Sequence, residues 1–195
     1  MPMRRSHYLL SVSLVLAACV SAPPVKVLKK PWLERMQQLQ DAQHWDVQAR
    51  AAGAVGAQGW QATLDWRQAS TTAEVRVAGP LGVGATGFRV TPQGLDYAAP
   101  TPGLANAAEY LQQRLGFAPP FENLRFWLLG VPNPAQGYEF KANDSDRAAT
   151  LSQDGWTIDY SEYAVVGADT LPKRFTVHRD AVRVRIAIDH WNFSP

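Results

Sequence analysis

Few residues in this chain of 195 residues could carry out catalysis. The sequence contains no Gly-x-Ser-x-Gly elbow, no His-Glu-x-x-His pair and no Gly-x-x-x-x-Gly-Lys-Ser/Thr loop. His44, His178 and His190 lack partners at metal-ligand spacing, so we expect them at the surface or at strand edges. The sequence therefore predicts no metal site and no reaction that ATP drives directly.

Two short motifs resemble ligand sites but are better explained as turns. Residues 82–87 match Gly-x-Gly-x-x-Gly, yet a dinucleotide fingerprint must open a helix. Here Phe88 to Val90 has the pattern of a strand, and Pro92 would break a helix. Asn143-Asp144-Ser145-Asp146 begins like a calcium loop but lacks its glycine and its distant glutamate. We expect a glycine loop and a polar turn.

The least implausible acid pair of an enzyme would be Asp159 with Glu162. Both lie around the solvent face of one predicted strand end, where carboxylates are common and catalysis is not. A cell-wall enzyme built on this pair is one hypothesis, and we expect instead that the protein is not an enzyme.

The chemistry that the sequence does support is lipid attachment at Cys19. Arg4-Arg5 precedes an apolar run over residues 8–18, which is shorter than the roughly 20 residues that a membrane-spanning helix needs. The run ends in Leu16-Ala17-Ala18-Cys19, which looks like a bacterial lipobox. In proteins with that box, the cysteine sulfur receives a diacylglyceryl group and the new amino terminus is acylated. We therefore expect residues 1–18 to be a signal peptide, the alternative being a plain export signal followed by a chance cysteine.

The rest of the composition agrees with a protein held on a membrane by lipid. Cys19 is the only cysteine, so an intramolecular disulfide is excluded. No Asp follows it, which permits sorting to the outer membrane. Without residues 1–18 the Lys+Arg count falls from 19 to 17, equal to the 17 Asp+Glu, which argues against nucleic acid. Each buried acyl methylene contributes about 0.8 kcal/mol, so the anchor needs no help from charge.

Residues 19–30 have no apolar period and are expected to form a flexible tether, followed by a single domain over residues 31–195. Trp32, Met36 and Leu39 recur at helical spacing and predict a short amphipathic helix.

Two further short helices are expected in the middle of the chain. Thr101 can cap the first, which Gly116 ends; Pro119-Pro120 opens the second, which Gly130 ends. Their apolar stripes comprise Leu111, Leu115, Leu124, Trp127 and Leu128.

Alternation of apolar and polar residues predicts most of the remaining chain as strands. Residues 60–67 and 73–77 form one hairpin, and residues 88–90 and 95–97 form a second. Further strands are expected between residues 138 and 189, for a total of roughly nine to eleven. Short turns favour an antiparallel meander, and its twist favours a barrel or an incomplete barrel. An incomplete barrel needs a cover for its apolar face, and the two helices are candidates for that lid.

Gly79-Pro80-Leu81-Gly82-Val83-Gly84 is an apolar loop between glycines and a proline. Such a loop on a membrane-tethered protein can enter a bilayer interface. Alternatively, Leu81 and Val83 tuck back against the sheet, which composition alone favours.

Taken in order, these features resemble the LolB family of outer-membrane lipoprotein receptors. We place Trp45 and Arg50 before the first strand. Ala51, which follows Arg50, departs from the resemblance, because the family has a glycine at that position. The residues that carry the resemblance are Cys19, Trp45, Arg50, Leu64, Trp66, Gly79-Pro80-Leu81-Gly82, Leu124, Trp127, Leu129-Gly130, Pro132, Gly155-Trp156, Tyr160, Tyr163, Leu171-Pro172 and Trp191.

The resemblance implies a mainly β fold with short helices: an incomplete, half-open antiparallel β-barrel with an α-helical lid over an apolar cavity. It implies a lipid-anchored monomer on the periplasmic face of the outer membrane. Such a protein accepts lipoproteins from the periplasmic carrier LolA and inserts them into the inner leaflet without ATP. Its partners are then LolA, client lipoproteins with their acyl chains, and outer-membrane phospholipid, and it needs no cofactor beyond the lipid on Cys19.

The resemblance also implies roles for particular residues. Pro80, Leu81, Gly82 and Val83 match the projecting loop that assists release, with Leu81 at its apolar tip, which reverses the preference for a tucked loop. Because a strand facing a cavity and a strand facing packed side chains have the same period, candidates for the cavity could instead be core. These candidates are Trp60, Leu64, Trp66, Val75, Val77, Phe88, Trp156, Ile158, Val184 and Ile186.

A general lipid-binding envelope lipoprotein of the same fold, acting as a sensor or lipid shuttle without a carrier partner, is the alternative function. A crosslink between the purified carrier and this protein would distinguish the two.

Overall fold

A single curved sheet and three α-helices make up the part of the chain that the structure, a computed structural model, describes, namely residues 30–98 and 106–193. The helices are α1 (Lys30–Gln40), α2 (Ala107–Leu115) and α3 (Phe121–Leu128), with a 3-10 turn at Pro80–Gly82. The strands are β1 (His44–Val55), β2 (Gln58–Ala69), β3 (Thr72–Ala78), β4 (Thr86–Thr91), β5 (Gly94–Tyr97), β6 (Tyr138–Ala142), β7 (Ala148–Gln153), β8 (Trp156–Val166), β9 (Asp169–Arg179) and β10 (Val182–Phe193).

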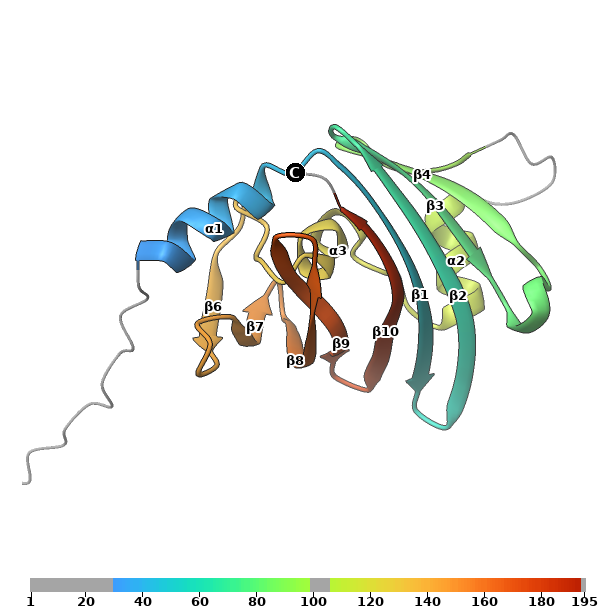
Figure 1. Ribbon diagram of the computed structural model, residues 1–195. Coiled ribbons are helices and arrows are strands. Elements are labelled where there is room, and N and C mark those ends of the chain that lie inside the picture. The colour runs from blue at the N-terminus through green and yellow to red at the C-terminus, as the bar shows by residue number, and fades with distance from the viewer. Residues whose placement is uncertain (1–29, 99–105, 194–195) are drawn as a thin grey trace, which may run out of the picture.

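The ten strands form one antiparallel sheet in the order β5-β4-β3-β2-β1-β10-β9-β8-β7-β6. Consecutive strands are neighbours except where α2 and α3 separate β5 from β6, which become the two edges. Figure 1 shows the sheet curving, with both helices behind its strands. The sheet does not close, which confirms the predicted incomplete barrel.

The centre of the sheet is the pairing of β1 with β10, which extends from Trp45 opposite Phe193 to Val55 opposite Val182. Strand β1 was not predicted, because the middle of its inward row holds the small residues Ala49, Ala51 and Gly53, which carry little of the β-branched signal that predicts a strand. The placement of Trp45 and Arg50 before the first strand was therefore wrong, since both lie within β1.

Side chains alternate between the two faces of each strand, so every strand sends an apolar row into the concave side. Val47, Trp66 and Ile158 belong to such rows and are buried. The hairpins predicted around residues 68–72 and 92–94 are confirmed by the pairing of β2 with β3 and of β4 with β5. The predicted polar turn is confirmed between β6 and β7, where Asn143 Oδ1 accepts hydrogen bonds from the backbone N–H groups of Ser145 and Arg147.

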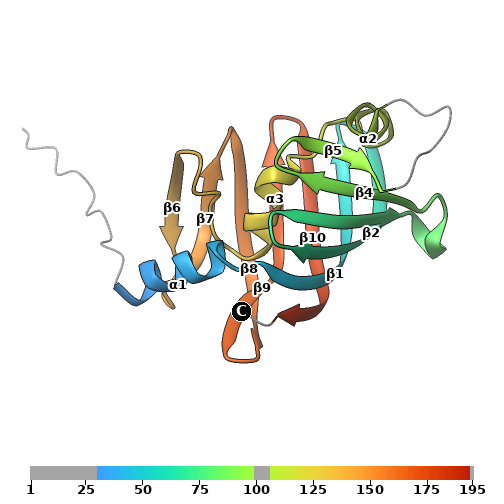
Figure 2. The ribbon, with the colours of Figure 1, turned by 90° about the horizontal axis from the view of Figure 1, so that it is seen from above.

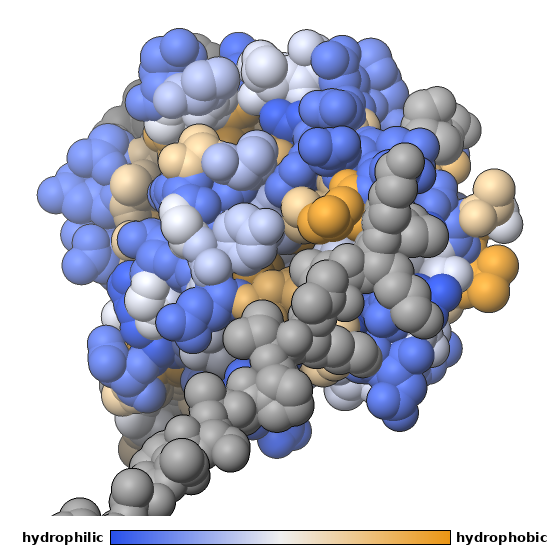
Figure 3. Space-filling view, turned by 90° about the vertical axis from the view of Figure 1, so that its left-hand side faces the viewer, coloured by the Kyte–Doolittle hydropathy of each residue, from blue (hydrophilic) through white to orange (hydrophobic). Residues whose placement is uncertain are grey.

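Helix α1 covers one end of the sheet beside β6 and β7, away from α2 (Figure 2). Trp32 stacks on Phe140 with ring centroids 4.8 Å apart, and Arg35 donates a hydrogen bond of 2.8 Å to the carbonyl of Thr170. The face of the molecule on this side is mostly hydrophilic, with apolar side chains in small patches (Figure 3). None of the helices within residues 30–98 and 106–193 combines the length and the apolar character that crossing a membrane would require.

The end of α2 at Gly116 and the start of α3 after Pro119-Pro120 are confirmed, but α2 begins at Ala107, later than the predicted start near Pro102. Asn106 caps α2, its Oδ1 accepting a hydrogen bond of 2.9 Å from the N–H of Glu109. Gly116 ends α2 with φ of 81°, a conformation that favours glycine. The cap predicted at Thr101 lies outside the described residues.

A buried polar network fixes α3 to the sheet. Trp127 Nε1 and the backbone N–H of Asn133 both donate to Gln153 Oε1, at 3.0 and 2.9 Å. Gln153 Nε2 donates to the carbonyl of Asn133 at 2.9 Å, and the hydroxyl of Tyr160 donates to the carbonyl of Trp127 at 2.9 Å. Because Gln153 is buried, its amide satisfies groups that water does not reach.

Replacing Gln153 with leucine should lower the free energy of unfolding by about 2 to 5 kcal/mol, because two buried N–H donors lose their acceptor. Urea unfolding of the wild-type and variant proteins measures the difference. Gln48→Leu, on the exposed face of β1, is the matched control and should stay within about 0.5 kcal/mol of the wild type. Equal stability of Gln153→Leu and the wild type would contradict the anchoring role of Gln153.

Candidate functional site

An apolar cavity lies between the concave face of the sheet and the two lid helices α2 and α3. Its volume is about 80 Å³. Strands β1, β2, β3, β8, β9 and β10 supply one wall, and α2, α3 and the segment between them supply the other. The lining residues are Ala51, Trp60, Ala62, Thr63, Leu64, Val77, Leu111, Leu115, Phe117, Pro119, Pro120, Phe121, Leu124, Trp127, Trp156, Val177, Val184 and Ile186.

Many of the predicted cavity and lid residues come together in this lining. From the strands these are Trp60, Leu64, Val77, Trp156, Val184 and Ile186, and from the helices Leu111, Leu115, Leu124 and Trp127.

The remaining predicted residues do not line the cavity, which corrects their predicted role. Trp66, Val75, Ile158 and Leu128 are packed in the core and do not line the cavity, while Phe88 borders only a neighbouring groove. Trp66 illustrates the reason: it lies on the inward face of β2 like Trp60, but Trp45 and Phe121 stack against it at 6.0 and 6.2 Å. Strand period alone does not separate a packed side chain from a cavity wall.

The sequence analysis missed Phe117, which follows the glycine that ends α2. Its ring centroid lies 6.3 Å from that of Trp60 and 5.9 Å from that of Trp156, so Phe117 joins α2 to both sides of the sheet. An apolar residue in a short linker between two lid helices is a signal that could have identified it. Val177 and the small residues Ala51 and Ala62 were also missed.

The indole of Trp60 lies directly against Gly53, the residue opposite it on β1. A side chain at Gly53 would overlap that ring, so the glycine gives the indole its place in the cavity wall. Ala51 lies in the same strand and lines the cavity. Its position is therefore within a strand and not at a turn.

The cavity is smaller than the roughly 300 Å³ at which ligand pockets usually begin. A long apolar ligand can enter only if the lid moves. The two helices differ in this respect, because α3 is held by the Gln153 network whereas Tyr110 of α2 meets Thr86 of β4 through a hydroxyl pair at 3.4 Å. The arrangement favours displacement of α2 over displacement of α3.

The glycine loop between β3 and β4 projects from the molecule. Leu81 is fully exposed at 103% and Val83 is 67% exposed, so the tucked alternative is wrong. Leu81 has φ of 58°, a left-handed conformation that costs about 1 to 2 kcal/mol in a residue with a side chain. Hydrogen bonds from the N–H of Gly79 to the carbonyl of Val83 and from the N–H of Gly82 to the carbonyl of Gly79 hold the turn. As predicted, β4 follows this loop, and no α-helix opens after the glycines of residues 82–87.

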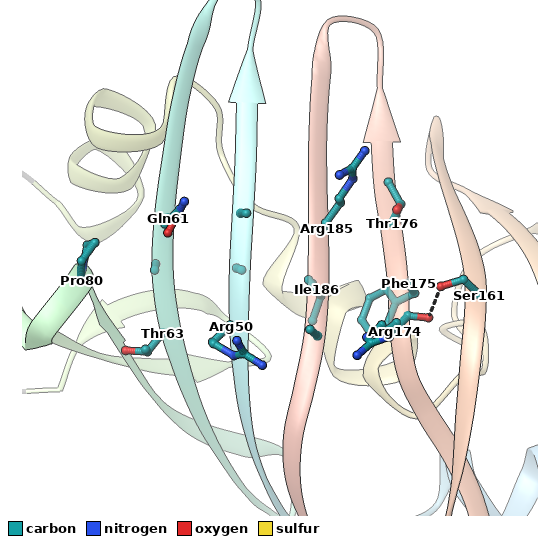
Figure 4. A pocket seen from close by; sticks show the side chains of 14 residues that line it. Arg50, Gln61, Thr63, Pro80, Ser161, Arg174, Phe175, Thr176, Arg185 and Ile186 are labelled. Carbon is teal, nitrogen blue, oxygen red and sulfur yellow. Dashed lines mark hydrogen bonds between the residues drawn. The ribbon is translucent and has the colours of Figure 1, made fainter.

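Arg50 lies on the opposite face of the sheet from the cavity. It borders a hollow of about 610 Å³ on the outer face, together with Arg174 and Arg185 (Figure 4). Its guanidinium binds Asp189 through two contacts, Nη2 to Oδ1 at 2.6 Å and Nε to Oδ2 at 2.8 Å. This hydrogen bonding lowers the pKa of Asp189 and raises the pKa of Arg50. The pair joins the outer faces of β1 and β10 and does not reach the apolar cavity.

The carboxylates considered as an acid pair contact different partners. Asp159 contacts His178 at 3.1 Å, and Glu162 contacts Lys173 at 2.8 Å and Arg174 at 2.9 Å. The hydrogen bond from Lys173 lowers the pKa of Glu162, which is the opposite of what a general acid requires. Within the described residues, no three His, Cys, Asp or Glu side chains gather as a metal site would need.

Comparisons with known proteins agree with this geometry. Residues 43–191 match the family model described as outer membrane lipoprotein LolB. An outer-membrane lipoprotein LolB from Nitrosococcus oceani is 33% identical over 198 residues, covering 98% of each chain. One from Alkalilimnicola ehrlichii is 32% identical over 202 residues, covering 99% of this chain and 100% of the relative.

A solved structure shares the fold at low sequence identity. The crystal structure of a LolA superfamily protein from Nitrosomonas europaea superposes with a TM-score of 0.57 at 9% identity, covering 87% of this chain and 94% of that one. The family match spans β1 to β9 in full and most of β10, and thus the lid helices, the cavity strands and the projecting loop. The chain belongs to the LolB family of outer membrane lipoproteins.

Proposed function

We propose that this protein accepts lipoproteins from the soluble carrier LolA at the periplasmic face of the outer membrane and inserts them into its inner leaflet. The observation that carries the proposal is the combination of two features in one small domain. One is the apolar cavity under a lid, and the other is the projecting loop with the fully exposed Leu81. The loop leaves β3 at the end of the sheet where the β1–β2 turn lies. The loop and the cavity residues at the start of β2 are therefore at the same end of the molecule.

The cavity provides what a lipoprotein needs between two membranes. Exposing an acyl chain to water costs about 0.8 kcal/mol per methylene, so the chains must remain shielded during transfer. Transfer without ATP then follows the order of affinities: the cavity binds the chains more tightly than the carrier does, and the bilayer binds them more tightly than the cavity.

Cys19 lies outside the described residues, and its role is part of the proposal. The lipobox-like sequence around it supports a diacylglyceryl group on its sulfur and an acyl group on its amino terminus. We place the protein on the membrane as a monomer, with its tether allowing the loop to reach outer-membrane phospholipid. The substrate is a lipoprotein with its acyl chains, and no reaction is catalysed.

Replacing Leu81 with glutamate should leave client binding intact and reduce insertion into phospholipid vesicles by at least about tenfold, because a charge replaces the apolar group that enters the bilayer. The measurement follows a radiolabelled lipoprotein from purified LolA to this protein and then to the vesicles. Val165→Glu is the matched control, since Val165 is also an exposed apolar residue, at 80%, but lies near the hairpin of β8 and β9. Equal insertion by Leu81→Glu and the wild type would remove the loop from the mechanism.

A version of the chain that begins at Val20 should carry acyl chains when purified from cells, because its cavity is the apolar site available to them. Mass spectrometry of an organic extract detects the chains. Incubation of the same protein with lipoprotein-loaded LolA should yield a crosslinked complex. Acyl chains without any complex would favour the general lipid-binding alternative. The absence of both the acyl chains and the complex would contradict both functions.

A further inference from the structure

We propose that acyl chains pass between the cavity and the bilayer through the seam between α2 and strands β2 to β4. The seam is defined by Trp60, Ala62, Val77, Tyr110, Leu111 and Leu115. This inference rests on the proposed function and assigns the route that the transferred chains take.

A groove of about 450 Å³ follows this seam on the surface. Unlike the inner cavity of about 80 Å³, it is within the range of roughly 300 to 1,000 Å³ that ligand sites occupy. The groove is therefore large enough to hold part of a chain before the lid moves.

The groove and the cavity share a wall. Trp60, Ala62, Val77, Leu111 and Leu115 line both. At its other end the groove is bordered by Gly79, Pro80 and Gly84, which belong to the loop that carries Leu81. The wall that the two spaces share is apolar, and the rest of the groove, toward the loop, also carries polar side chains such as Gln61 and Gln113. Movement of α2 away from β2 and β3 would join the two spaces.

The attachments of the helices indicate which side of the lid opens. Within the described residues, the side-chain hydrogen bond that joins α2 to the sheet is the 3.4 Å contact between the hydroxyls of Tyr110 and Thr86. The cap at Asn106 bonds to Glu109 within α2 itself and does not hold the helix to the strands. On the other side, α3 would have to break the buried contacts of Trp127 with Gln153 and Tyr160.

The groove suits an acyl chain better than a peptide. Its floor is formed by β2, β3 and β4; β3 and β4 are paired on both sides, whereas residues 58–62 of β2 have no partner on the β3 side. A peptide could bond only to that short stretch of β2, and its other peptide groups would stay unpaired along the apolar wall, which is costly. An acyl chain needs no such partners. The exposed Arg114 at the outer end, close to Gly84, places a positive charge where lipid phosphates would lie when the loop is inserted.

The test links the two sides of the seam reversibly. In the full lipidated chain, Thr86→Cys and Tyr110→Cys introduce two thiols, and a short bis-thiosulfonate reagent bridges them through bonds that a reductant cleaves. The two side-chain oxygens are 3.4 Å apart in the wild type. Because cysteine is much shorter than tyrosine, the spacer of the reagent is chosen to span the length of the lost phenol ring as well. The protein is placed in vesicles of phosphatidylethanolamine and phosphatidylglycerol, and a radiolabelled lipoprotein is supplied on LolA. Bridging should slow client arrival in the vesicles by at least about tenfold, and the reductant should restore it.

The matched control bridges α1 to β9 with the same reagent, through Arg35→Cys and Asp169→Cys, whose wild-type side chains form an ion pair of 2.7 Å. This bridge does not touch the seam and should leave transfer unchanged. Unaltered transfer across a bridged seam, or an equal loss from both bridges, would overturn the proposed route while leaving the function standing. Absence of transfer in the unmodified chain would instead overturn the function itself.

Discussion

The failure of β5 and β6 to pair leaves the apolar concave face of the sheet without a cover of its own. Burial of that face contributes roughly 25 cal/mol for each Å² removed from water, so helices that cover it are strongly favoured. Closing the sheet would have produced a barrel filled by its own side chains. With open edges, the helices α2 and α3, which lie between β5 and β6 in the sequence, supply the cover.

The two covering helices are held by different kinds of interaction. The polar network around Gln153 is directional and gives α3 one position, because each buried donor and acceptor has a specific partner. The contacts of α2 are mainly apolar, through Leu111 and Leu115, and such contacts are not directional. The same fold therefore combines a fixed wall with a wall that can be displaced at lower cost.

How far the sequence predicts this structure depends on where the information lies. The hairpins, the helix ends and the open sheet follow from local patterns, as the pairing of β2 with β3 and the ends of α2 and α3 show. The alanine-rich β1 was missed because its identity as a strand comes from pairing with β10, far away in the sequence. Likewise, Trp60 and Trp66 have the same period on one strand, and only the position of α3 and Phe121 decides that Trp66 is packed. The exposure of Leu81 was predicted only by the family resemblance, because composition alone favoured a loop tucked against the sheet.

The pairing of β1 with β10 also determines when the domain can fold. The middle of the sheet joins residues 45–55 of β1 to residues 182–193 of β10, so β1 cannot complete its pairing until β10 has been synthesised. Contacts so distant in sequence raise the contact order and slow folding. The half-synthesised chain lacks the partner that completes its central ladder, so it stays unfolded for longer. A chain in that state is well suited to threading through a secretion channel before the sheet forms.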